Sequence, residues 1–138
     1  MKLKTVRHSI HFNATSSEIY DLLMISKRHA TFSGSPAKIS VKVGGPFTAY
    51  DGTIEGKNLE LFKGKKIVQS WRMTEWPKGH FSTVTWTFRK PDEGGCTMDF
   101  IQEGVPLEFY SAIEEGWHEH YWEPMKLYLA KLRDDEDT

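Results

Sequence analysis

The sequence predicts a single α+β domain in which a curved antiparallel sheet wraps around a long carboxy-terminal helix. Three observations lead to this prediction. A strand-like segment and a short helix open the chain, short strand-like runs joined by tight turns fill its middle, and an amphipathic helix closes it. The apolar face of a sheet must be covered, and the closing helix is long enough to cover it. The domain is expected to span residues 1–133.

The first two elements follow from periodicity and capping. Residues Thr5–Asn13 alternate, with Val6 and Ile10 among the apolar residues of one face, which predicts a half-buried strand. Thr15 and Glu18 have the spacing of a capping box, so a helix is expected to begin there. The sequence from Ser33 to Pro36 cannot continue a helix, which therefore ends between Arg28 and Phe32.

Short β-like runs fill the middle of the chain. Glycine-containing turns separate them, and connections this short make the sheet antiparallel. The predicted strands are Lys38–Val43, Phe47–Tyr50, Thr53–Phe62, Lys66–Met73, Phe81–Arg89 and Cys96–Glu103.

The last element is a predicted helix over Leu107–Leu132. Its apolar residues recur at steps of three and four, so one stripe can face the sheet. Pro124 lacks a backbone N–H, and a kink is expected just before it. Four of the five residues in Asp134–Thr138 are acidic, and this tail is expected to be disordered.

Composition excludes several classes of partner and location. Eighteen Lys and Arg stand against nineteen Asp and Glu, so no net field favours nucleic acid or an anionic membrane. No run of 18 apolar residues and no secretion signal is present. The single cysteine, Cys96, fits a reducing compartment, and the cytoplasm is the expected location.

Neither a metal site nor a catalytic site is expected. His118 and His120 lie two residues apart, so on a helix they point about 200° apart and cannot share an ion. Glu114 and His118 have the i,i+4 spacing, but a solvated charged face explains that pair. Cys96 is expected to be a small buried hydrophobe, and no nucleophile–base motif accompanies it. No cofactor is expected, and catalysis ranks third among the functions considered.

Aromatic residues make up 13% of the chain and suggest a groove between sheet and helix. Alternation places one face of two neighbouring strands toward the closing helix. The rings either fill this space as a core or leave a cavity for a small hydrophobic ligand. The candidate cavity residues are Val84, Trp86, Phe88, Met98, Phe100, Trp117 and Tyr121.

Trp76 and His80 form a separate candidate site for partner binding. They lie in a predicted turn between strands, where Pro77 and Gly79 break the β pattern. We expect Trp76 to be partly exposed, as tryptophans at binding hot spots often are before the partner binds. The alternative is that Trp76 folds back over the sheet edge and caps the core.

Three stretches resemble the carboxy-terminal domain of activators of the 90-kDa heat-shock chaperone ATPase. The first begins at Val43-Gly44-Gly45-Pro46-Phe47, the second covers Ile67–Arg72 and Glu75–Thr85, and the third joins Gly104-Val105-Pro106 to Gly116-Trp117, Tyr121-Trp122 and Pro124-Met125-Lys126. This family belongs to the START-like superfamily of helix-grip folds, which also includes the birch-pollen allergens.

The resemblance implies a helix-grip fold and a non-catalytic protein that contacts a 90-kDa heat-shock chaperone. Two-domain activators carry a further amino-terminal domain, and nothing before Thr5 is expected to encode one. A carrier or sensor of a small hydrophobic ligand is the alternative function.

Overall fold

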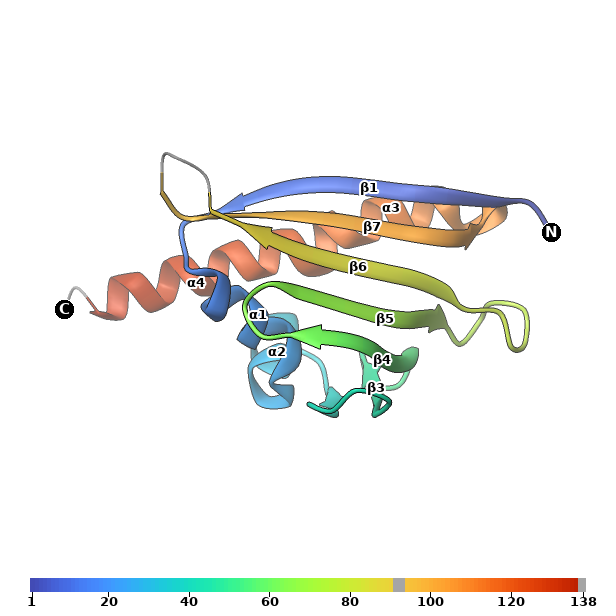
Figure 1. Ribbon diagram of the computed structural model, residues 1–138, viewed down its shortest axis with the longest axis horizontal. Coiled ribbons are helices and arrows are strands. Elements are labelled where there is room, and N and C mark those ends of the chain that lie inside the picture. The colour runs from blue at the N-terminus through green and yellow to red at the C-terminus, as the bar shows by residue number, and fades with distance from the viewer. Residues whose placement is uncertain (91–93, 137–138) are drawn as a thin grey trace.

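The computed structural model describes residues 1–90 and 94–136 and contains one seven-stranded antiparallel sheet (Figure 1). The strand order is β1-β7-β6-β5-β4-β3-β2. The sheet therefore joins the first strand directly to the last. The strands are β1 (Leu3–Phe12), β2 (Lys38–Ile39), β3 (Pro46–Ala49), β4 (Ile54–Phe62), β5 (Lys66–Met73), β6 (Ser82–Arg89) and β7 (Cys96–Pro106).

Two short helices follow β1, where the sequence predicted one. In α1 (Ser16–Met24) the predicted capping box is confirmed: the Thr15 hydroxyl accepts from the Glu18 N–H, and the Glu18 carboxylate accepts from the Thr15 N–H. The chain becomes extended at Ile25, and α2 (Ser26–Ser33) then begins in a new direction. The Ser26 hydroxyl accepts from the Ile39 N–H at 2.7 Å, which ties the start of α2 to β2.

Strand β2 is shorter than predicted because a buried side chain holds the segment after it in a loop. Asn58 is fully buried in β4, and its amide donates to the carbonyls of Ser40 and Lys42. The Gly44 N–H donates to the Asn58 carbonyl. These bonds replace a strand ladder, so the β pattern predicted up to Val43 ends at Ile39.

The long closing helix is confirmed, with two irregular turns. It comprises a 3₁₀ turn η1 (Leu107–Phe109), α3 (Tyr110–Trp117), a π-helical turn η2 (His118–Trp122) and α4 (Glu123–Glu136). The helical backbone includes residues 134–136, which were predicted to belong to a disordered tail, while residues 137–138 lie outside the described part of the chain. Figure 1 shows α3 and α4 running along one face of the sheet.

The π-helical turn lies just before Pro124, where a kink was predicted. The Glu123 N–H donates to the His118 carbonyl, five residues earlier. Pro124 has no N–H to donate to the His120 carbonyl, four residues earlier. The hydroxyl of Tyr50, from the turn between β3 and β4, donates to that carbonyl instead. The β3–β4 turn thus supplies a donor to a carbonyl with which Pro124 cannot pair.

The core lies between the sheet and the closing helix. Trp117 packs against Phe100 with ring centroids 4.5 Å apart, and Trp122 is fully buried beside it. The Trp117 indole N–H donates to Gln102 at 2.7 Å, and the Gln102 amide donates to Ser82 at 3.0 Å. Helix and sheet are therefore joined by aromatic packing and by a buried polar chain. Within the described ranges, no helix is both long and apolar enough to cross a membrane.

Candidate binding pocket

The groove predicted from the aromatic residues of β6 and β7 is a filled core. Val84, Met98 and Phe100 are fully buried and Trp86 is 3% exposed, while Phe88 is half-buried and packs against Tyr20. The space beside Trp86 and Tyr121 is a cavity of about 10 Å³, which holds one water molecule at most. Of the two alternatives that the sequence left open, the filled core describes Val84, Trp86, Met98 and Phe100, because their own side chains fill the space.

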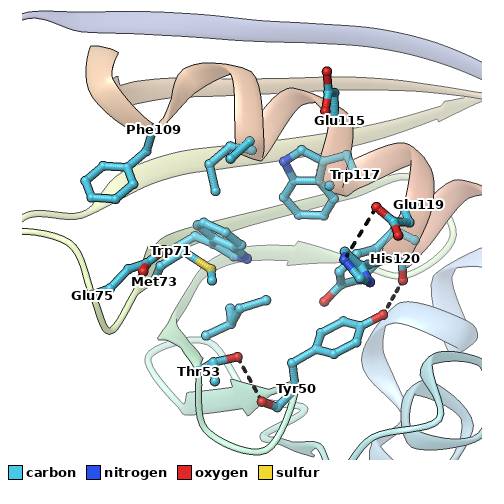
Figure 2. A pocket seen from close by; sticks show the side chains of 15 residues that line it. Tyr50, Thr53, Trp71, Met73, Glu75, Phe109, Glu115, Trp117, Glu119 and His120 are labelled. Atoms are coloured by element: carbon cyan, nitrogen blue, oxygen red, sulfur yellow. Dashed lines mark hydrogen bonds and ion pairs between the residues drawn. The ribbon is translucent and has the colours of Figure 1, made fainter.

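An open pocket of about 420 Å³ lies beside the first half of the closing helix (Figure 2). One wall comes from η1, α3 and η2, and the other from the β3–β4 turn and the ends of β4 and β5. Of the predicted cavity residues, Trp117 and Tyr121 line it. The other lining residues were not predicted: Tyr50, Thr53, Ile54, Trp71, Met73, Glu75, Phe109, Ala112, Ile113, Glu115, Gly116, Glu119 and His120.

The pocket has an apolar interior and acidic ends. Figure 2 shows the rings of Phe109, Trp71 and Trp117 around the cavity, and the centroids of the two indoles lie 5.4 Å apart. Glu75 lies at one end of the pocket and Glu119 at the other. Neither Lys nor Arg is among the described residues that line it. The pocket can therefore hold an apolar group and favours positive charge beside it.

Tyr50 forms a constrained corner of this pocket. Its backbone φ is 49°, and that of Asp51 is 56°, so two consecutive non-glycine residues adopt the left-handed region. Burial raises the pKa of the Tyr50 hydroxyl to about 12, so the group remains a hydrogen-bond donor at neutral pH. Strained backbone of this kind is found preferentially at functional sites.

Trp76 is buried, so the expected exposed contact at this position is wrong. The side chain is 3% exposed and packs against Trp71 and Phe109, with centroid distances of 5.5 and 6.3 Å. The guanidinium of Arg72 donates to the Trp76 carbonyl at 2.8 Å and folds the loop back over the sheet. His80 is half-buried, and its Nε2–H donates to the Gly104 carbonyl at 2.7 Å.

A buried polar pair, His29 and Tyr121, lies between α2 and η2. His29 Nε2 and the Tyr121 hydroxyl are 2.9 Å apart, and both residues are buried. Burial lowers the pKa of His29 to about 4 and raises the pKa of Tyr121 well above its usual value. His29 is therefore neutral at pH 7. Its Nδ1 has no hydrogen-bond partner within the described ranges.

One group of described residues has the composition of a metal site: His8, Glu114 and His118, whose ligand atoms lie within 4.8 Å of one another. The sequence could not indicate that His8, in β1, lies beside Glu114 and His118, because the two segments are far apart in the chain. The Trp122 indole N–H donates to His8 Nδ1 at 2.9 Å, so the proton of the neutral ring is on Nε2. That N–H donates to Glu114 at 3.2 Å and cannot ligate a metal.

The orientation of His8 thus opposes metal binding. A metal-bound histidine normally donates its second N–H to an acceptor, whereas here the second nitrogen faces a donor. Burial is the main cause that lowers the pKa of His8 and keeps the ring neutral, despite the neighbouring Glu114. The arrangement is a hydrogen-bonded cluster that joins β1 to the closing helix.

The seven-stranded sheet, the long closing helix and the pocket between them define a START-like helix-grip domain. Residues 13–130 match the family model described as activator of Hsp90 ATPase homolog 1-like protein, so the chain belongs to this family.

Relatives and solved structures agree with this membership. The chain is 32% identical over 89% of its length to an activator of 90 kDa heat shock protein ATPase homolog from Dictyostelium discoideum, of which it covers 32%. It is also 32% identical to the human homolog 1 over 83% of its length, and covers 34% of that protein. The chain therefore spans about a third of the length of these curated relatives.

The fold matches that of a crystal structure of an HSP90 activator from Plasmodium falciparum, with a TM-score of 0.85 and 22% identity. The similarity covers 91% of this chain and 96% of the other. The expected helix-grip fold is thereby confirmed.

Proposed function

We propose that this domain binds a 90-kDa heat-shock chaperone and promotes its ATPase activity without catalysing a reaction itself. The observation that carries the proposal is the family match over residues 13–130, together with relatives whose names describe activation of that ATPase. The open pocket supplies an aromatic contact surface for a partner. The buried, single Cys96 is compatible with a reducing compartment such as the cytoplasm, where we place this function.

Binding and stimulation can be measured separately. Isothermal titration of the domain into purified 90-kDa heat-shock chaperone, with and without a non-hydrolysable ATP analogue, should show a saturable complex. ATP hydrolysis by the chaperone should rise as the domain is added, and an inhibitor specific for the chaperone should abolish the signal. If no complex forms in either nucleotide state, this proposal is wrong.

The second candidate function is transport or sensing of a small hydrophobic ligand. It is supported by the pocket volume of about 420 Å³, which lies in the range of roughly 300–1,000 Å³ typical of ligand pockets. Native mass spectrometry of the protein purified from its expression host should then show a bound molecule, which solvent extraction would remove. Protein whose mass matches the sequence alone in every preparation would argue against this function.

A further inference from the structure

We infer that the pocket recognises a segment of the partner protein in which a large apolar side chain is flanked by Lys or Arg. This inference rests on the proposed function and adds the chemistry of the bound segment. Apolar rings line the middle of the pocket, and Glu75 and Glu119 lie at its two ends (Figure 2). An apolar side chain with a basic residue on either side complements both features at once.

Among the described residues, no Lys or Arg forms an ion pair with Glu75, Glu115 or Glu119. Glu119 has a side chain that is 77% exposed, and one carboxylate oxygen lies 4.0 Å from Nε2 of His120. Glu115 also borders the pocket, although Figure 2 shows its carboxylate pointing away from the rings. Since the whole chain has a net charge of only −1, this acidity is local. It favours a basic segment over a neutral or acidic one.

Gly116 keeps the helical wall of the pocket open. Glycine is among the least favourable residues inside a helix, yet Gly116 lies within α3. A Cβ added there would meet only the edge of the His120 ring, at 3.8 Å, so packing does not require glycine. A larger side chain at this position would enter the pocket instead. Three unfavourable local features therefore border one cavity: a glycine within a helix, the left-handed backbone of Tyr50 and the π-helical turn.

Three synthetic peptides test this specificity. One has adjacent Leu and Phe flanked on each side by two Lys, the second has Glu in place of Lys, and the third has Ser in place of Leu and Phe. Binding is followed by isothermal titration and by the fluorescence of Trp71 and Trp117, which line the pocket. The Lys-flanked peptide should bind about tenfold more tightly than either control. Added salt should reduce its preference over the Glu-flanked peptide.

Matched variants locate the interaction. Substituting Glu75→Gln, Glu115→Gln and Glu119→Gln together should reduce the preference for Lys over Glu to about twofold or less. The control triple substitution, Glu103→Gln, Glu108→Gln and Glu123→Gln, changes the net charge equally at exposed positions outside the pocket and should leave the preference intact. Gly116→Leu should weaken binding of the Lys-flanked peptide at least tenfold, while Gly116→Ala, which adds only a methyl group, should retain it.

The purified chaperone separates this inference from the proposed function. If the chaperone binds the unmodified domain and loses at least fivefold in affinity with the pocket variants but not with the control triple, the inference is supported. If it binds all variants equally, the proposed function stands and the inference is overturned. If dodecyltrimethylammonium below its micelle concentration binds the pocket more tightly than the Lys-flanked peptide, the occupant is a small molecule, and the peptide assignment is likewise overturned.

Discussion

Trp117 packs against the sheet and also lines the pocket. One part of its ring packs on Phe100 in the core, and the residue also lines the open cavity beside Trp71. Its N–H donates to the side-chain amide oxygen of Gln102, which is fully buried. A change in this side chain therefore affects stability through two separable contributions, ring packing and a buried hydrogen bond.

The hydrogen-bond contribution can be isolated with Trp117→Phe, which retains an aromatic ring. The substitution leaves Oε1 of the Gln102 side chain without this donor and should lower the free energy of unfolding by about 1–3 kcal/mol, measured by urea denaturation. Trp117→Ala also creates a cavity and should cost about 3–5 kcal/mol. Adding Gln102→Met to Trp117→Phe should recover part of the loss. A Trp117→Phe protein as stable as the unmodified domain would contradict the role of this bond.

Trp76 is expected to stabilise the domain, contrary to its predicted role as an exposed contact. Because the ring is 3% exposed, Trp76→Ala should lower the free energy of unfolding by about 3–5 kcal/mol. The exposed Lys78 in the same loop is the control, and Lys78→Ala should change stability by less than about 0.5 kcal/mol. Equal thermal midpoints for the two variants would show that the loop does not cover the core.

The position of Trp76 could not be predicted from its neighbours in the chain. Pro77 and Gly79 correctly indicated a break after β5, but they do not determine the direction in which the loop folds. That direction depends on Arg72, which hydrogen-bonds to Glu55 and to the Trp76 carbonyl. Burial of Trp117 and Tyr121, in contrast, followed from helical periodicity and is confirmed.

At the scale of elements, Tyr50 and Pro124 should be energetically coupled. Tyr50→Phe removes the donor to the His120 carbonyl and should cost about 1–3 kcal/mol of stability. In a Pro124→Ala background, the new N–H at position 124 can donate to that carbonyl, so the same substitution should cost less. A double-mutant cycle by urea denaturation measures the difference. Strictly additive effects would show that the proline does not create the need for Tyr50.

Most elements could be predicted because their signals are local. Alternating residues and the glycine turns located the strands within a few residues, and the capping box located the start of α1. The π-helical turn was not predicted beyond a disturbance near Pro124, because the Tyr50 hydroxyl that pairs with the His120 carbonyl comes from a distant part of the chain. Within this turn two consecutive residues, Tyr121 and Trp122, are both buried.

For the whole molecule, His29 should make stability depend on pH. Its pKa is about 4 in the folded protein and about 6.5 when exposed, so the unfolded chain binds a proton more readily between these values. The contribution is therefore fully present above about pH 6.5 and is lost as the pH falls toward 4. The loss should be on the order of 3 kcal/mol. His8, whose pKa is also lowered, adds in the same direction.

Urea denaturation at several pH values between 7.5 and 4.5 measures this effect. His29→Gln removes the titrating group and should flatten the dependence on pH, although it also changes the contact with Tyr121. The control is His11→Gln, at an exposed residue of β1, which should leave the slope unchanged. Parallel curves for the unmodified domain and His29→Gln would contradict a buried neutral histidine.

The fold as a whole could be predicted, whereas the location of the pocket could not. The order of elements and the family resemblance led to a curved sheet and a long helix, both confirmed. Whether rings fill a space or leave it open depends on how the helix lies across the sheet. Here the rings fill the space at β6 and β7, and the cavity opens beside Gly116 and the β3–β4 turn.

The pairing of β1 with β7 has a consequence for the synthesis of this protein. Leu3 lies opposite Pro106, and Phe12 lies opposite Cys96, so the partner of the first strand leaves the ribosome after all the other strands. Until then both edges of β1 are unpaired, whereas in the finished sheet only its outer edge is, and its apolar face is uncovered. Contacts this distant in sequence slow folding, since a long loop must close before they form. The nascent chain therefore completes its sheet late, and until then the segment that forms β1 is prone to aggregate with other chains.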